Sequence, residues 1–175
     1  TVAPVYVKTP HTAYLISDSV VVSRDDILSN ATGGCFPPKL TLLSDSVFYC
    51  SSAGTNPNYI RFQFTGGSVD SVPVTVLDTI IPSLSLRNDT IYLGASGAVD
   101  SIVFANIDVG SMDNCSIDST TINGLQELYF TCADTGAQTI QVQAWDASGN
   151  TIIDSSIVYV LDTVQSSYTV NAVTA

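Results

Sequence analysis

The sequence predicts an all-β fold made of two tandem antiparallel β-sandwich domains. Three observations support this prediction. Val, Ile and Thr are abundant, Met occurs once and charged residues make up only 12% of the chain, a composition that favours strands over long helices. Short apolar runs are separated by turn residues throughout. The Leu-Asp-Thr sequence at 77–79 returns at 161–163, which indicates an internal repeat.

The repeat sets the predicted domain boundaries. Residues 1–4 match residues 79–82 in pattern, so we expect one domain at 1–78 and a second at 79–162. The remaining residues, 163–175, either begin a third repeat or form a strand that is donated to a neighbouring subunit. Each domain has about 80 residues, near the lower limit for a self-sufficient hydrophobic core.

In the first repeat, alternation of apolar and polar residues is clearest at 59–64, where Ile60, Phe62 and Phe64 are expected to face inward. Glycine and proline pairs at Gly33-Gly34 and Pro37-Pro38 predict a loop over 30–38. We expect a short helical turn at 25–29. The other expected strands lie at 4–8, 13–16, 20–22, 39–43, 46–50 and 71–77.

The second repeat follows the same plan. Ile140, Val142 and Ala144 alternate with polar residues, and the Asp-Ala-Ser-Gly-Asn sequence at 146–150 predicts a turn in which Gly149 adopts a positive φ. Residues 108–114 read as a loop. The expected strands lie at 83–87, 90–93, 98–106, 127–132, 139–144 and 152–161. About seven short strands with regular turns predict a sandwich of immunoglobulin-like type.

Charge and hydropathy exclude two classes of partner. The net charge of −11 repels phosphate backbones, so nucleic acid is not expected to bind. No run of 18 apolar residues is present, and no membrane span is expected in this segment. Because there is no initiator Met and no signal-peptide pattern, we interpret the chain as part of something longer.

The four cysteines fall as one pair per repeat, Cys35 with Cys50 and Cys115 with Cys132, separated by 14 and 16 residues. This repeated spacing predicts disulfide bonds and an oxidising compartment. The alternative is a zinc site. It is disfavoured because there is no Cys-x-x-Cys sequence and His11 is the only histidine.

Several short sequences in the second repeat resemble a known family. They are Asp113-Asn114-Cys115, the Phe-Thr-Cys-Ala-Asp-Thr-Gly sequence at 130–136, the Trp-Asp-Ala-Ser-Gly-Asn-Thr sequence at 145–151, and Val-Leu-Asp-Thr at 160–163. In this order they resemble the HYR-like repeat, an immunoglobulin/fibronectin-like module that is strung in tandem through very large surface adhesins of Bacteroidota-type bacteria.

The first repeat is a diverged copy of the same module. It keeps Pro4, Cys35, Cys50 and the Leu77-Asp78 exit, but it lacks the Asp-Asn before its first cysteine and the Asp-Ala-Ser-Gly-Asn turn. The resemblance implies secretion to the cell surface, further copies of the repeat in the same protein, and a role in attachment or filaments. It implies no catalysis. The residues agree, because one histidine and one glutamate offer no spacing of a nucleophile and a base.

Acidic residues cluster in the predicted turns. Calcium binds six to eight oxygen atoms of such groups, whereas Asp and Asn are also common turn formers that bond to their own backbone. No contiguous calcium-binding sequence is present, so we expect no cofactor and keep calcium as the alternative. The candidate ligands are Asp78, Asp108, Asp113, Asp146 and Asp162, with Asn114 and Asn150 beside two of them.

A second pattern is Asp followed by Ser or Thr and then by an aliphatic residue or Thr. It occurs eight times, against about two expected by chance from this composition. It resembles the O-glycosylation sequence of secreted Bacteroidota proteins. The alternative is a turn-into-strand tripeptide, because Asp caps turns and β-branched residues begin strands. The candidate hydroxyls are Ser19, Ser46, Ser71, Thr79, Thr90, Ser101, Ser119 and Thr163.

These observations favour a non-enzymatic, extracellular structural and adhesive module. We expect it in a large bacterial surface protein or filament that serves attachment, gliding or capture of other cells. Its partners are then further copies of the repeat, other subunits of a homo-oligomer or filament, and a glycan or protein receptor. Two alternatives stay open: a glycan- or protein-binding module, and an accessory domain of a secreted hydrolase.

Overall fold

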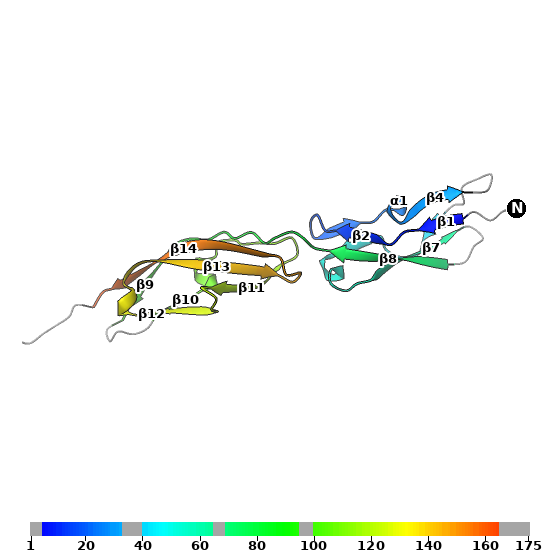
Figure 1. Ribbon diagram of the computed structural model, residues 1–175. Coiled ribbons are helices and arrows are strands. Elements are labelled where there is room, and N and C mark those ends of the chain that lie inside the picture. Colours follow the sequence, from blue (N-terminus) through cyan, green and yellow to red (C-terminus); the bar gives the residue numbers. More distant parts are fainter. Residues whose placement is uncertain (1–4, 33–39, 65–68, 95–99, 165–175) are drawn as a thin grey trace, which may run out of the picture. The chain divides into compact units, whose positions relative to one another are not determined.

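The computed structural model describes residues 5–32, 40–64, 69–94 and 100–164. The chain forms two compact units. Unit 1 contains residues 1–82 together with two short segments from later in the chain, Asp113–Ser116 and Asp146–Asn150. Unit 2 contains Ser83–Met112, Ile117–Trp145 and Thr151–Ala175. Both units consist almost entirely of strands, as Figure 1 shows, and the prediction of two tandem β-sandwiches is confirmed.

The main sheet of unit 1 has the order β2-β8-β7-β5. Its strands are β2 (His11–Tyr14), β5 (Leu40–Leu42), β7 (Asn58–Phe64) and β8 (Val69–Leu77). The β5–β7 and β7–β8 pairs are antiparallel. The β2–β8 pair is parallel, with His11 opposite Val74 and Tyr14 opposite Leu77. The first strand of this sheet therefore runs beside the last one, in the same direction.

Two strand pairs complete unit 1. One is β3 (Ser19–Val21) with β6 (Val47–Tyr49), and the other is β1 (Val5–Lys8) with β4 (Leu28–Thr32); both are antiparallel. A single helical turn, α1 (Arg24–Ile27), follows Ser23, whose backbone N–H and hydroxyl both donate to Asp26. This capping box satisfies polar groups at the start of the turn. A 3₁₀ turn, η1 (Cys50–Ser52), follows β6.

The core of unit 1 follows the alternation seen in the sequence. Ile60 and Phe62 of β7 are fully buried, while Tyr59 and Arg61, on either side of Ile60, are exposed. Strand β8 buries every second residue over Val72, Val74 and Val76. Because successive side chains of a strand point to opposite faces, this pattern places one face of the sheet against the core. The other buried core residues are Ala13, Leu15, Val22, Ile27 and Phe48.

Unit 2 has a main sheet of order β11-β13-β14-β9. Its strands are β9 (Asp89–Leu93), β11 (Ile117–Ile122), β13 (Gly136–Asp146) and β14 (Thr151–Asp162). Strands β13 and β14 form a long antiparallel hairpin from Gly136 opposite Val160 to Trp145 opposite Thr151. Strand β9 pairs with β14 in parallel, so this unit too has its first sheet strand beside its last.

The second layer of unit 2 is the antiparallel pair β10 (Asp100–Val103) and β12 (Glu127–Phe130). A helical turn, α2 (Phe104–Ile107), and a 3₁₀ turn, η2 (Cys132–Asp134), follow these two strands. The buried core residues are Ile91, Leu93, Ile102, Ile107, Ile122, Phe130, Ile140, Val142, Val158 and Val160. In the described part of the chain, no helix is long and apolar enough to cross a membrane.

Four predicted elements differ from the structure. The strand expected over 83–87 is present only as two isolated bridges, Ser83 with Met112 and Leu86 with Asp108. The segment expected to be loop from residue 30 begins with strand β4, which ends at Thr32. The strand expected over 98–106 ends at Val103 and continues as α2. Strand β11 was not predicted, because Ile117–Ile122 is mostly polar and half-exposed and lies at the edge of its sheet.

Candidate functional site

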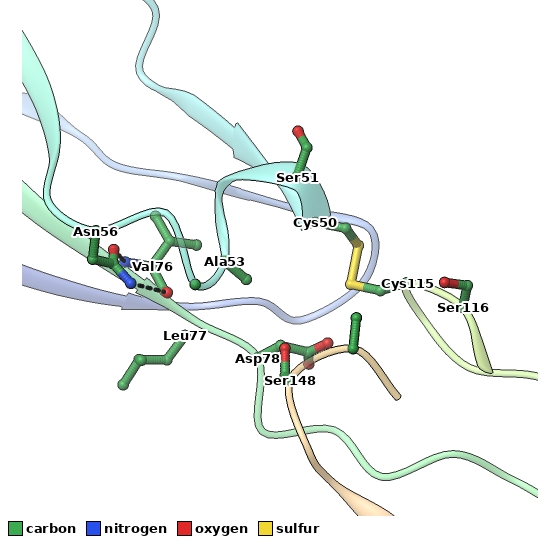
Figure 2. A pocket seen from close by; sticks show the side chains of 12 residues that line it. Cys50, Ser51, Ala53, Asn56, Val76, Leu77, Asp78, Cys115, Ser116 and Ser148 are labelled. Atoms are coloured by element: carbon green, nitrogen blue, oxygen red, sulfur yellow. Dashed lines mark hydrogen bonds between the residues drawn. A yellow bond between two sulfur atoms is a disulfide. The ribbon is translucent and has the colours of Figure 1, made fainter. Parts of the chain in front are cut away.

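The candidate site lies in unit 1, around the Asp78 carboxylate at the end of β8 (Figure 2). The amide of Asn56 fixes this end of the strand: its oxygen accepts from the Val76 N–H at 2.8 Å, and its nitrogen donates to the Val76 carbonyl at 3.2 Å. Asp78 follows two residues later. The loop Asp113–Ser116 and the turn Asp146–Asn150 supply the other side chains of the site.

A disulfide joins Cys50, the first residue of η1, to Cys115 in the loop. Figure 2 shows this bond beside Asp78. The expected pairing within each repeat is therefore wrong for these two cysteines. They are 65 positions apart in sequence and come from different repeats, yet their Cα atoms lie 5.4 Å apart. Cys132 is unpaired and exposed. Cys35 lies outside the described residues.

The Asp78 side chain is almost completely buried, with 7% of its surface exposed. Its Oδ1 atom accepts from the Ile80 N–H at 3.1 Å and from the Asn114 amide at 3.2 Å. The backbone carbonyl of Asp78 accepts from the side chain of Asn150 at 3.1 Å. The second carboxylate oxygen, Oδ2, is buried and has no hydrogen-bond partner.

The neighbouring loop contributes two more oxygen atoms of the same kind. One oxygen of Asp113, Oδ2, accepts from the backbone N–H groups of Cys115 and Ser116 at 2.9 and 3.2 Å. The amide nitrogen of Asn114 donates to the Ser17 carbonyl at 3.0 Å. The remaining oxygens, Asp113 Oδ1 and Asn114 Oδ1, are buried and unpartnered. In the side chains of Asp113 and Asn114, one polar atom is therefore hydrogen-bonded, and the other, Oδ1, has no hydrogen-bond partner.

The two carboxylates lie close together. Oxygen atoms of Asp78 and Asp113 and the sulfur of Cys115 are all within 4.8 Å of one another. At this separation two like charges repel by roughly 3 kcal/mol if the effective dielectric constant is about 20. The sulfur belongs to a disulfide and is no thiolate ligand. The chemical character of the cluster is thus that of hard, anionic oxygen.

The structure separates the five acidic residues that the sequence offers as candidate calcium ligands. Asp78 and Asp113 come together. Asp146 belongs to unit 1 as well, but both its oxygens accept hydrogen bonds, from Ser148 N–H, Asn150 N–H and the Asn150 amide at 2.7–2.8 Å. Asp146 is therefore a turn former. Sequence reasoning placed Asn114 in the loop without choosing it, although the Asp113-Asn114-Cys115 sequence was a usable signal.

The other two acidic candidates are also turn formers. Asp108 accepts from the N–H groups of Gly110 and Ser111. Hydrogen bonding to Ser111, with the side-chain bond as the largest cause, holds the pKa of Asp108 below its ordinary value. Asp162 accepts from the Val164 N–H at 2.9 Å, which repeats the bond between Asp78 and Ile80. Among the described residues, neither Asp108 nor Asp162 joins a cluster of candidate metal ligands.

The predicted glycan hydroxyls are distributed over both units. Thr79, Ser119 and Thr163 are exposed, and the other five residues are half-buried. Asp70, Asp89 and Asp100 each accept from the N–H group of the Ser or Thr that follows, at 2.8–2.9 Å. These bonds lie at the beginning of strands β8, β9 and β10, which gives the Asp-Ser/Thr pattern a structural role of the turn-into-strand kind. O-glycosylation stays a prediction.

A recess of about 430 Å³ lies beside the disulfide and Asp78 (Figure 2). Its lining is mainly small or polar and comes from η1 and the turn after it, the end of β8 with Asp78, and the segments Asp113–Ser116 and Asp146–Asn150. The lining residues are Cys50, Ser51, Ala53, Gly54, Asn56, Val76, Leu77, Asp78, Cys115, Ser116, Ala147 and Ser148. His11, the sole histidine, lies on β2 instead. The residues that line the recess therefore include no histidine to serve as a base.

Comparisons with known proteins give structural neighbours only. No family model matches the chain, and no curated protein does, so the HYR-like resemblance stays a prediction. Cadherin repeats 1–2 of human mucin-like protocadherin are 11% identical, with a TM-score of 0.40, and the match covers 92% of this chain and 99% of that one.

Two other solved structures have similar statistics. The fibronectin(III)-like modules of Clostridium thermocellum CbhA are 12% identical with a TM-score of 0.35, and the match covers 97% and 100% of the two chains. Immunoglobulin domains 1–4 of Sidekick-1 are 12% identical with a TM-score of 0.29, covering 90% of this chain and 51% of that one. All three TM-scores are below 0.5, and no functional argument follows from them.

Proposed function

We propose that this chain is a non-enzymatic structural module that transmits mechanical load within an extracellular adhesive protein. The observation that supports this function best is the pairing of strands in the two units. In each unit, the strand by which the chain enters the main sheet is hydrogen-bonded in parallel to the strand by which it leaves. If these strands were antiparallel, the same tension would break their hydrogen bonds one after another and would not load them together.

The mechanical argument is clearest in unit 2. Strand β9 pairs with the end of β14 from Asp89 opposite Val158 to Leu93 opposite Asp162. When the Cys50–Cys115 disulfide is reduced, tension applied through the chain pulls β9 from its amino end and β14 from its carboxyl end. The intact bond closes a covalent loop over residues 51–114, which include β9, and carries part of the tension past them. Because the strands are parallel, this tension acts along them and loads the hydrogen bonds of the ladder together. In an antiparallel hairpin pulled from its open end, the bonds break one after another.

Unit 1 has the same arrangement between β2 and β8, from His11 opposite Val74 to Tyr14 opposite Leu77. The same geometry in both units supports a tandem module that bears tension. The Cys50–Cys115 disulfide supports an oxidising compartment, hence an extracellular location. The HYR-like resemblance adds the finer proposal of a bacterial surface adhesin or filament that contains further copies of this repeat.

A pulling experiment in two directions tests the proposal. The Cys50–Cys115 disulfide is reduced for both directions, so that tension follows the whole chain. In the first direction the full chain is held at its two termini, which loads β9 against β14 in shear. In the second, handles are attached at Ala137 and Tyr159, which face each other at the open end of the β13–β14 hairpin. We expect unit 2 to unfold at a severalfold higher force in the first direction, because the bonds share the load.

The two directions use the same fold and differ only in the attachment points. The wild-type sequence with internal handles is thus its own control, provided that both handled proteins have the same melting temperature. Equal forces in the two directions, or a lower force from the termini, would contradict a load-bearing function. The alternative of a ligand-binding module makes no prediction about pulling direction.

A further inference from the structure

We propose that Asp78, Asp113 and Asn114 form a calcium-binding site in unit 1. The three unpartnered atoms described above, Asp78 Oδ2, Asp113 Oδ1 and Asn114 Oδ1, are the direct observation. Among the described residues, only one other buried side-chain oxygen or nitrogen has no hydrogen-bond partner, the hydroxyl oxygen of Thr121 in unit 2. Three of four such atoms therefore occur in one cluster.

Buried polar atoms without a partner are rare, since each loses its hydration without compensation. Asp78 is the strongest case because only 7% of its surface is exposed. Figure 2 shows its carboxylate directed toward the loop that contains Cys115. A water molecule could satisfy the Asn114 oxygen, but it could not neutralise two carboxylates whose oxygens lie within 4.8 Å. A cation does both.

The orientation of the three groups is set by bonds on their other sides. The Ser17 carbonyl and Asp78 Oδ1 are both acceptors, so they require the nitrogen of the Asn114 amide to face them. The Asn114 oxygen consequently points the other way. Backbone N–H groups hold Asp113 by Oδ2, which leaves Oδ1 for a ligand. The free oxygens are thus held in place before any ion binds, and this lowers the cost of ordering them.

Among the described residues, no basic side chain forms an ion pair with this cluster. The ion pairs found among the described residues join Lys8 to Asp70 and Arg24 to Asp25, and neither involves Asp78 or Asp113. The chain as a whole carries a net charge of −11, so its field attracts cations.

The ligand chemistry indicates calcium. All three free atoms are hard oxygens, and the nearby sulfur is in a disulfide, which disfavours zinc. Calcium accepts carboxylate and amide oxygens in flexible geometry, and water or backbone carbonyls complete its six to eight ligands. Magnesium requires a stricter octahedron. Three side-chain ligands correspond to a weak site, with a dissociation constant on the order of 10⁻⁴–10⁻³ M, as in extracellular modules.

Thermal unfolding of the oxidised full chain in calcium chloride and in EDTA tests the site. At calcium about tenfold above the dissociation constant, the ratio of folded to unfolded protein should rise about tenfold. This corresponds to a rise of about 5 °C in the melting temperature. Titration of calcium into the folded protein, followed by calorimetry, measures the affinity directly.

Asp78→Asn and Asp113→Asn are the test variants. Each keeps an oxygen that can accept the backbone hydrogen bonds and removes one of the two charges. We expect both to lose the calcium-dependent rise in melting temperature, while in EDTA they melt at or above the wild-type temperature because the repulsion is relieved. Asp162→Asn is the matched control. It changes the equivalent residue of the second Leu-Asp-Thr sequence, which has the same backbone bond and, within the described part of the chain, belongs to no cluster of candidate metal ligands.

The site is overturned if the wild-type protein melts at the same temperature in calcium and in EDTA. It is also overturned if Asp162→Asn removes the calcium effect as fully as Asp78→Asn does. Equal stabilisation by magnesium at the same concentration rejects the assignment to calcium. None of these outcomes bears on the pulling experiment, so the calcium site and the load-bearing function fail independently.

Discussion

At the scale of single residues, the most consequential contact is the bond between Cys50 and Cys115. It closes a loop with a sequence separation of 65, and in the chain-entropy model a loop of this size stabilises the folded state by about 4 kcal/mol. We expect the double variant Cys50→Ser/Cys115→Ser to lose stability of this order. Urea unfolding at equilibrium, compared with the oxidised wild-type chain, measures the loss.

Cys132→Ser is the control for this prediction, because Cys132 is exposed and forms no disulfide in the structure. It should unfold at the wild-type urea concentration. A peptide map under non-reducing conditions checks the pairing itself. Recovery of a Cys115–Cys132 peptide in place of the Cys50–Cys115 peptide would show that the pairing described above is wrong.

The pairing shows what spacing can and cannot predict. The even count and the regular spacing of cysteines correctly indicated a disulfide, because both are typical of chains whose cysteines are oxidised in pairs. They did not indicate the partners, because a short separation in sequence is no measure of distance in a folded chain. The same limit applies to the acidic residues. Sequence placed Asp78 and Asp113 in separate turns, and only the fold reveals that their oxygens meet.

At the scale of elements, the β13–β14 hairpin depends on its turn at Asp146–Asn150. Asp146 is buried and accepts hydrogen bonds from the N–H groups of Ser148 and Asn150, and Gly149 has a φ of 89°. Asp146→Ala removes the acceptor of these N–H groups, and a hydrogen bond to a charged group contributes about 1.5–3 kcal/mol. We expect a loss of about 2 kcal/mol or more in the free energy of unfolding, measured by urea titration.

Asp146→Asn is the matched variant, since its amide oxygen can still accept from both N–H groups. It should recover at least half of the stability that Asp146→Ala loses. If the two variants are equally destabilised, the negative charge matters more than the hydrogen bonds, and the turn is stabilised in a different way from the one described here.

Strands were predictable from sequence where one face is buried and the other is not. Strand β7 and residues 138–144 of β13 alternate in burial, and the sequence alternates with them. Two of the misses have the opposite character. Residues 103–105, Val-Phe-Ala, continue an apolar run and conceal the change from β10 to α2. Strand β11 has Asp, Ser and Thr at its centre, so hydrophobic alternation could not indicate it.

At the scale of the whole molecule, the two repeats place equivalent cysteines in equivalent structures. Cys50 begins η1 after β6, and Cys132 begins η2 two residues after β12. Asp78 and Asp162 make the same hydrogen bond to the backbone two residues later. Cys132 therefore stands where Cys50 stands, one repeat further along, but without the counterpart of Cys115 that Cys50 bonds to.

This equivalence gives a prediction that rests on the proposed tandem array. In the folded, oxidised 1–175 chain, iodoacetamide should alkylate Cys132, because the thiol is exposed. When a second copy of residues 79–164 is joined after Asp162, the loop equivalent to Asp113–Ser116 follows the first Cys132 as it follows Cys50 in the present chain. We then expect the first Cys132 to become protected by a disulfide bond and the Cys132 of the last copy to react.

Mass spectrometry of the alkylated peptides distinguishes the two cysteines if the appended copy carries one substitution at an exposed position of the peptide, which changes its mass and not its fold. Replacing the appended equivalent of Cys115 by Ser should restore alkylation of the first Cys132. If the first Cys132 reacts fully in the extended chain, the disulfide at Cys50 is a feature of this pair of repeats and not a rule for joining successive copies.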